Sequence, residues 1–157
     1  MKYLKSDKRG MSLAEVIVAS AVVLLVFVIL ISANSIYYKT AAASLKSVKA
    51  TYLLEEGQEA VIFLKNSDWT NFPAAGATSY YFRWTGTTWQ ATTTSALIDN
   101  AYQRAFVVSS VNRDGNDNIV STGGSLDQNT KKVSVLVTWS DAGSTTTKSI
   151  SAYITKP

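Results

Sequence analysis

The chain of 157 residues contains no cysteine and no histidine. Without cysteine, neither a disulfide framework nor a thiolate metal site can form. Without histidine, the commonest general base and the commonest metal ligand are missing as well. The remaining carboxylates, lysines and tyrosines form no constellation that recommends a reaction. The sequence therefore favours a protein that is not an enzyme, and it predicts no catalytic residue, cofactor or metal ligand.

Excess positive charge is scarce outside the first ten residues. The formal net charge is +4, and residues 1–10 hold four basic side chains against one acidic side chain. From Met11 onward, 11 basic side chains face 10 acidic ones. A nucleic-acid-binding domain needs a basic face, and this nearly balanced remainder indicates none. Nucleic acid is therefore the least expected kind of partner.

Charged residues are absent from a long stretch near the N-terminus, with one exception. Between Gly10 and Lys39 the only charged side chain is Glu15, and residues 16–31 are almost entirely aliphatic. A helix of about 20 apolar residues crosses the ~30 Å hydrocarbon core of a bilayer. We therefore expect residues 11–38 to form a transmembrane helix.

The flanks of this stretch predict its orientation. Lys8 and Arg9 belong to the basic segment 1–10. The positive-inside rule places that segment in the cytoplasm and the rest of the chain outside. Tyr37 and Tyr38 stand where an interfacial aromatic belt would lie. The prediction is a single-pass protein of the cytoplasmic membrane.

Helix breakers are rare in the next segment as well. Residues 39–65 contain no proline and only one glycine, Gly57, and they are rich in good helix formers. A helix over 11–65 would be roughly 80 Å long, which suits a filament subunit better than a self-contained globule. Its apolar residues face more than one side, so we expect it to be covered by the protein's own sheet and by a neighbouring subunit. One predicted group is Leu45, Val48, Tyr52, Leu53, Ala60 and Leu64, and a second is Leu54, Val61 and Ile62.

The hydrophobic period changes to two after residues 66–68, which end the helix. Alternation of this kind predicts strands of an antiparallel sheet with one buried face. The expected strands are 79–85, 87–92, 104–111, 119–120, 131–139 and 148–155. The fold class is therefore α+β, with a long N-terminal helix packed on a C-terminal sheet domain, here called the head, over 66–157.

Three groups after the predicted transmembrane segment have a functional and a structural interpretation. Aromatic residues suggest a stacking platform, but strand alternation favours core packing and leaves Tyr81 with Arg83 as the more plausible exposed pair. Residues 112–118 are rich in oxygen ligands but lack EF-hand spacing, and such residues are common in turns. The acidic cluster of the helix is better explained by a solvated face or by salt bridges to Lys49 or a neighbour than by a site. The aromatic residues are Tyr80, Tyr81, Phe82, Trp84, Trp89 and Trp139, and the acidic cluster is Glu55, Glu56 and Glu59.

The segment Arg9-Gly10-Met11-Ser12-Leu13-Ala14-Glu15 resembles the prepilin peptidase recognition site of type IV pilins and type II secretion pseudopilins. The family usually has Phe at the first mature position, and Met is a tolerated variant. The resemblance covers about 25 residues of this chain; the head is similar to the family only in architecture. The resemblance implies cleavage between Gly10 and Met11, N-methylation of Met11, and removal of the leader 1–10.

The same resemblance implies partners and a subtype. The partners would be prepilin peptidase, other pilin subunits, an inner-membrane assembly platform and, before assembly, membrane lipid. Major pilins commonly carry helix breakers in the membrane segment and a C-terminal disulfide, and this chain has neither. These departures favour a minor pilin or a pseudopilin-like subunit.

Glu15 is the residue expected to direct assembly. A carboxylate inside a membrane costs ~2.5–3.5 kcal/mol on insertion scales, so it usually has a partner. The expected partner is the α-ammonium of Met11 in a neighbouring subunit, an attraction that would set the register of the helices. The alternative is a Glu that snorkels to the cytoplasmic interface without a role.

The sequence leaves a second processing route open. Residues 31–33 loosely match the site of ordinary signal peptidase. Cleavage there would release a soluble β-domain beginning at Asn34. The favoured function is a filament subunit of the pilin type, which ends in an extracellular or periplasmic filament. The alternative is a membrane-anchored or secreted β-domain that binds a ligand and does not assemble.

Overall fold

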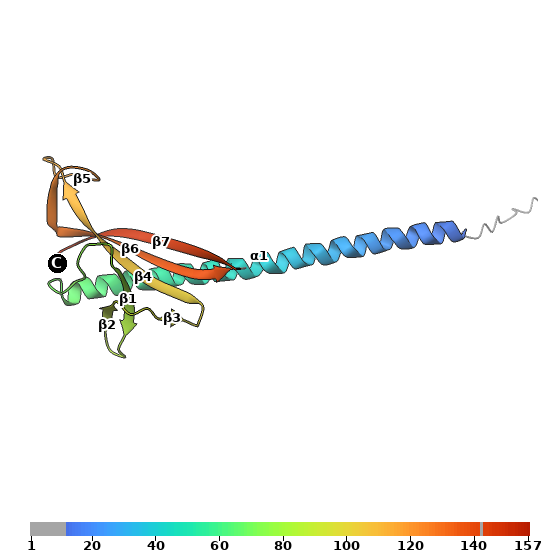
Figure 1. Cartoon of the computed structure of the whole chain (residues 1–157), viewed down its shortest axis with the longest axis horizontal. Helices are drawn as coiled ribbons and strands as arrows, with labels where there is room; N and C mark the ends of the chain where they lie inside the picture. The colour runs from blue at the N-terminus through green and yellow to red at the C-terminus, as the bar shows by residue number, and fades with distance from the viewer. Residues whose placement is uncertain (1–11, 142) are drawn as a thin grey trace, which may run out of the picture. The chain divides into compact units, whose positions relative to one another are not determined.

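The computed structural model describes residues 12–141 and 143–157. It contains one helix followed by seven strands (Figure 1). The chain divides into two compact units, residues 1–44 and residues 45–157. The helix α1 (Leu13–Ser67) contributes its first part to one unit and its second part to the other. A long helix and an antiparallel sheet in one chain confirm the predicted α+β class.

The described part of the first unit is purely helical. Every described residue from Ser12 to Thr40 is exposed. Branched aliphatic residues have modest helix propensity, but without proline or glycine nothing interrupts the backbone hydrogen bonds. The hydroxyls of Ser20 and Ser32 donate to the carbonyls of Ile17 and Val28, each at 2.8 Å. These two hydroxyls are therefore satisfied by the helix itself.

The second unit is built on a seven-stranded sheet in which every pairing is antiparallel. The main strand order is β2-β1-β4-β6-β7, and the short strands β3 and β5 both pair with β4. The long strands β4, β6 and β7 form the centre and one edge (Figure 1). The bounds are β1 (Ser79–Trp84), β2 (Trp89–Thr92), β3 (Leu97–Ile98), β4 (Tyr102–Arg113), β5 (Ile119–Val120), β6 (Ser125–Asp141) and β7 (Ser144–Thr155).

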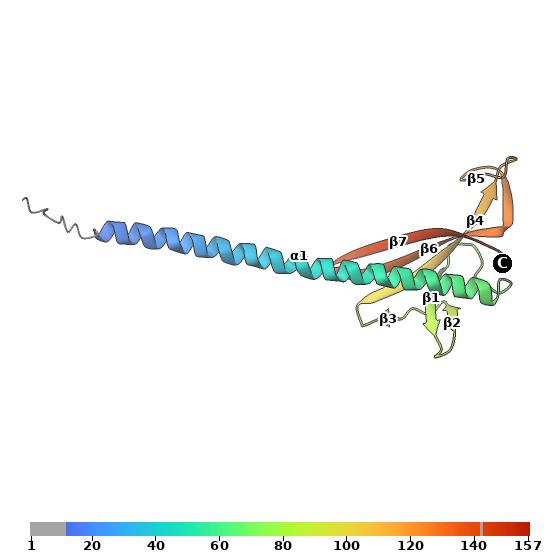
Figure 2. The ribbon, with the colours of Figure 1, turned by 180° about the vertical axis from the view of Figure 1, so that it is seen from behind.

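The core of this unit lies between one face of the sheet and residues 45–67 of α1, which run along that face (Figure 2). Phe106 and Val135 are fully buried at its centre. Alternate residues of β4 and β6 point inward, as the period of two predicts. The helix contributes six buried residues: Ala50, Leu53, Leu54, Gly57, Ala60 and Val61.

The predicted grouping of apolar residues on the helix is wrong in part. Leu53 and Ala60 pack on the sheet together with Leu54 and Val61, which were assigned to another side. The first group also contained Leu45, Val48 and Tyr52, and these three are exposed. They stand at i, i+3 and i+7, so they form a separate stripe. The helix therefore has a buried apolar side and an uncovered one within this unit.

The strand predictions are confirmed with two differences. All six expected strands are present, with β4, β6 and β7 longer than expected. The two-residue strand β3 was not predicted, because it follows a polar Thr and Ser tract. The N-terminal part of β6 was also not predicted, because its residues are polar. It forms a strand by pairing with the end of β4.

Candidate functional site

The first turn of α1 contains Glu15, the residue expected to direct assembly. Its backbone N–H donates to Ser12 Oγ at 3.3 Å, and its Oε2 accepts from the Ser12 N–H at 3.2 Å. This reciprocal pair is a capping box, which satisfies two otherwise free donors at the start of a helix. The spacing Ser-x-x-Glu was readable in the sequence and was overlooked. Glu15 therefore has a local structural role that the sequence analysis did not consider.

The remaining predicted processing residues lie outside the described residues. These are Lys8, Arg9, Gly10 and Met11. Their roles in cleavage, methylation and pairing with Glu15 stay predictions. In the described part of the chain, the Oε1 atom of Glu15 accepts no hydrogen bond.

The helix that follows Glu15 has the properties of a membrane span. Within the described residues, α1 is the one helix long and apolar enough to cross a bilayer, judged by length and composition. Its most apolar window has a mean hydropathy of 3.2 and no buried residue. The large aliphatic side chains of this part stay uncovered in the single chain. Contact with lipid or with other apolar helices would remove them from water.

A second uncovered apolar surface lies on α1 beside the sheet. We call Leu45, Val48 and Tyr52 the outer stripe; they are 72%, 52% and 67% exposed. These residues belong to the second unit, yet its sheet does not reach them. Contiguous exposed apolar residues on a helix are typical of an interaction surface.

A buried arginine fastens α1 to the sheet. Arg104, on β4, is 5% exposed in its side chain and forms an ion pair with Glu56 at 2.7 Å. Its Nη1 donates to the Leu53 carbonyl at 3.2 Å, and its guanidinium lies 5.2 Å from the Phe82 ring and 5.4 Å from the Trp89 ring. The acidic cluster was expected to form a solvated face or salt bridges to Lys49 or a neighbour. Glu55, Glu56 and Glu59 are all exposed, as expected, and Glu56 pairs with Arg104 rather than with Lys49. Arg104 and Phe106 are two residues apart, so their side chains face the same side of β4. This spacing was the feature of the sequence that could have predicted the burial of Arg104.

Three lysines add polar contacts at the other end of this interface. Lys46 pairs with Asp141 at 2.9 Å, and Lys148 donates to the Ser47 carbonyl at 3.2 Å. Lys49 pairs with Asp99, and the hydrogen bond that the lysine donates to this carboxylate raises the pKa of the lysine above its ordinary value. All of these contacts are accessible to water, so they orient the helix more than they stabilise it.

The oxygen-rich loop at 112–118 is organised by its own backbone. Asp114 Oδ1 accepts from the N–H groups of Asn116 and Asn118, both at 2.9 Å. The bonds from Asn118 and Asn116 lower the pKa of the Asp114 carboxyl below its ordinary value. In residues 12–141 and 143–157, no group of three or more acidic side chains has the geometry to hold a metal ion. The carboxylate of Asp114 is engaged as a loop cap.

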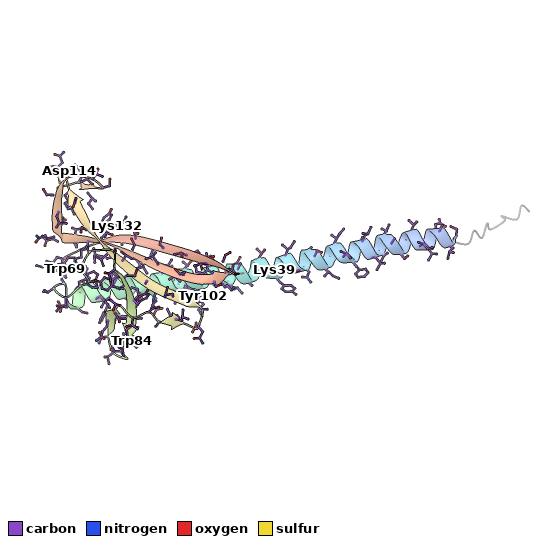
Figure 3. All side chains as sticks on the ribbon, viewed as in Figure 1. Lys39, Trp69, Trp84, Tyr102, Asp114 and Lys132 are labelled. Carbon is purple, nitrogen blue, oxygen red and sulfur yellow. The ribbon has the colours of Figure 1, made fainter. Side chains whose placement is uncertain are left out.

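The predicted exposed pair at β1 is only partly exposed. Arg83 is exposed, whereas Tyr81 is half-buried. Trp84 was predicted to point into the core with Phe82, and it is 53% exposed instead. It belongs to the β1–β2 hairpin, which extends to one side of α1 (Figure 3). The alternation is correct, but β1 continues past the end of its pairing with β4, so no core lies opposite Trp84.

Compared with known proteins, the chain matches no family model, no curated protein and no solved structure.

Proposed function

We propose that this protein is a structural subunit of a type IV pilus-type filament, of the minor pilin or pseudopilin-like kind. It is processed by prepilin peptidase at Gly10, anchored in the cytoplasmic membrane, and extracted into the filament with its head on the outside. The observation that carries the proposal is the single carboxylate, Glu15, at the start of the apolar part of α1 in which every residue is exposed.

The capping box does not account for the charge of Glu15. A neutral Gln at this position of the box accepts the same backbone hydrogen bond. A carboxylate is retained in an apolar segment at a cost of ~2.5–3.5 kcal/mol on insertion scales. The ammonium of a neighbouring Met11 would supply the missing counter-charge at Oε1, which accepts no bond within the described residues.

The outer stripe supports assembly over a simple anchor. Lipid covers an exposed apolar helix inside a bilayer, but a lone anchored domain has no need of a further stripe beside its sheet. Leu45, Val48 and Tyr52 remain exposed there. In a filament, helices of neighbouring subunits pack along such stripes and remove them from water.

The experiment compares three variants in cells that make the filament. Glu15→Gln keeps the hydrogen bonds of the capping box and removes the charge, whereas Glu15→Ala removes both. Ser12→Ala weakens the cap, typically by ~1 kcal/mol, and keeps the charge. We expect all three to reach the membrane, and we expect only Ser12→Ala to enter sheared filaments.

A contrary result is easily recognised. If Glu15→Gln enters filaments as well as the unmodified chain, Glu15 acts through its hydrogen bonds alone and the charge-pairing mechanism is wrong. If Ser12→Ala fails together with Glu15→Ala while Glu15→Gln succeeds, helix capping is what assembly requires.

A further inference from the structure

The strand β7 forms a long open edge of the sheet. It pairs with β6 along all of its 12 residues, and within the described strands nothing pairs with its other side. The other short border strands β2, β3 and β5 have four, two and two residues. Shortness is one of the devices by which proteins keep a sheet edge from pairing with another chain. Figure 1 shows β7 along one border of the sheet, where this device is not used.

The strand β7 also lacks the other features that protect an edge. Between Ser144 and Thr155, all of which the structure describes, there is no proline and no register shift, and the single charged residue is Lys148. Its ammonium donates to the Ser47 carbonyl and to Thr51 Oγ1, both at 3.2 Å, so it is directed toward α1 and not along the edge. The edge is therefore a template for a further strand.

The hydrogen-bond pattern shows which residues of β7 point their backbone groups outward. The Lys156 N–H donates to the Asn129 carbonyl at 2.8 Å, one position beyond the register pair of Thr155 with Thr130. Bonded pairs alternate in an antiparallel ladder, so the even-numbered residues of β7 are bonded to β6. The odd-numbered residues present their N–H and C=O groups to the open side. These residues are Thr145, Thr147, Ser149, Ser151, Tyr153 and Thr155.

An antiparallel second copy of β7 complements this edge. With a twofold axis at Ile150, every outward residue faces another outward residue, and all of the open backbone groups find partners. Cross-strand pairs of an aromatic with a β-branched residue, and of two hydroxyl residues, are favourable. The facing pairs are Thr145 with Thr155, Thr147 with Tyr153, and Ser149 with Ser151.

The side chains on both faces fit the same register. Ile150, which is 43% exposed and shares the helix side of the sheet with its register partner Val135, would lie against Ile150 of the copy. Lys148 would lie opposite Ala152, so no like charges would meet. On the other face, the hydroxyls of Ser134 and Ser151 already lie 2.8 Å apart across β6 and β7. The proposed pairing extends such contacts by one strand.

We propose that β7 pairs with β7 of a second copy, so that two heads share one continuous antiparallel sheet. Main-chain hydrogen bonds hold such a contact and the side chains select its register. The same edge serves both partners, so the contact closes as a pair and does not propagate. A foreign peptide is less favoured, because β7 has no free charge with which to select one, whereas its own sequence supplies matching pairs.

The pairing sets the relative direction of the two heads. Residues 45–67 of α1 run in the same direction as β7, since Lys148 near its start contacts Ser47, and Lys131 beside its end lies 4.9 Å from the Trp69 ring. Antiparallel β7 strands therefore reverse the two helix segments, which begin at opposite ends of the pair. Such a pair does not suit two anchors in one membrane. If the protein is the filament subunit proposed above, the contact joins two filaments or two facing membranes.

An introduced cysteine tests the register, because the chain has no cysteine of its own. Position 150 lies on the twofold axis in a non-hydrogen-bonded pair, where the ~4.5 Å between Cα atoms suits a disulfide. The full-length chain is placed in phosphatidylcholine nanodiscs at one chain per disc, concentrated and mildly oxidised. We expect Ile150→Cys to form a disulfide-linked dimer that carries two discs.

Thr146→Cys is the matched control for this disulfide. Thr146 is exposed on the same strand and on the same face as Ile150, but in the proposed register it faces position 154 of the copy and not itself. Its yield of linked discs should be lower than that of Ile150→Cys by about tenfold or more, because the two sulfurs cannot reach each other.

The unlinked association is measured by sedimentation of the same discs. Ile150→Lys places two ammonium groups opposite each other and should weaken pairing by about tenfold or more. Ile150→Thr keeps a neutral β-branched residue and should stay within about threefold of the unmodified chain. Thr93→Lys adds the same charge at an exposed position outside β7, and it should stay within about twofold.

Three results would overturn the proposal. The first is an equal yield of linked discs from Ile150→Cys and Thr146→Cys. The second is undiminished pairing by Ile150→Lys with a normal melting curve. The third is the formation of arrays of more than two discs, since that result requires pairing between unlike edges. Filament entry is measured separately through the Glu15 variants, so failure of this contact leaves the proposed function standing.

Discussion

Gly57 is a residue at which α1 lies in close contact with the sheet. A Cβ atom at this position would lie 2.7 Å from Val135 Cγ1 and 3.2 Å from Arg104 Cδ. Val135 is fully buried in the middle of β6 and cannot move aside without opening the core. The glycine is therefore required for packing, although glycine in a helix interior costs up to ~1 kcal/mol relative to alanine.

Gly57→Ala is expected to destabilise the head. Overpacking costs ~1–3 kcal/mol and is offset in part by the ~1 kcal/mol gain in helix propensity, so we expect a net loss of up to ~2 kcal/mol. Thermal unfolding followed by tryptophan fluorescence measures it. Gly76→Ala is the control, because nothing lies within 4 Å of its Cβ position and it should be nearly neutral. Equal melting temperatures for the two variants would show that the close approach is relieved at no cost.

Arg104 is the residue whose role the sequence least predicted. Apolar alternation in a strand does not predict that an arginine is buried. Only the spacing of two residues from Phe106 places Arg104 on the inward side of β4. Its charge is neutralised by Glu56, which comes from the helix and is 46% exposed. The ion pair is a tertiary contact between two residues that are 48 positions apart in the sequence. Local patterns carry no information about such a contact.

At the scale of elements, the outer part of β4 and β6 forms an arm with its own anchor. The register between these strands shifts after Ser110, so that Val111 pairs with Asp127. Arg113 donates to Asp127 at 2.7 Å and to the Asp117 carbonyl at 2.8 Å. The loop that joins β4 to β5 lies at the far end of this arm, where Asp114 is labelled (Figure 3). The polar network replaces the apolar packing that the arm lacks.

The arm has a defined response to acid. The guanidinium of Arg113, with bonds from Thr130 and the Asn129 N–H, lowers the pKa of Asp127 from 3.8 to about 2. A carboxyl whose pKa is lowered by folding stabilises the fold fully above its unfolded value near 3.8, and this contribution is lost as the pH falls through about 2. We expect the Asp127 carboxyl carbon to titrate near pH 2 in NMR spectra, and nearer 3.8 in Arg113→Ala.

Asp114 provides the internal control for that titration. Its lowered pKa comes from bonds to Asn118 and Asn116, so Arg113→Ala should leave its titration in place. An Asp127 carboxyl that titrates at the same pH with and without Arg113 would contradict the role assigned to the ion pair.

The strands that the sequence predicted are those with apolar alternation. Val133, Val135 and Val137 alternate cleanly, and all three are buried in β6. The residues of β6 before them have no such pattern and became a strand by pairing with β4. Trp84 shows the opposite case, because it lies on the predicted face of β1 but is exposed instead of buried. Alternation reports which side a residue faces, whereas burial depends on where the neighbouring strand ends.

At the scale of the whole molecule, one helix serves two environments. The part before Leu45 carries a single charged residue up to Lys39 and is apolar enough to cross a membrane, whereas the part after it packs on a folded sheet. The length and apolar character of the first part were predictable from composition, and these are the properties that a membrane-spanning helix requires. The buried side of the second part was not, because its apolar residues occupy two sides and only the sheet selects between them.

The mature N-terminus of the chain in an assembled filament tests the proposed role as a filament subunit most directly. Intact-mass analysis of the protein recovered from sheared surface filaments measures it directly. We predict a chain that begins at Met11 and carries one added methyl group. Recovery only as an uncut chain in the membrane fraction, or as a soluble domain beginning at Asn34, would contradict the proposal that this protein is a filament subunit.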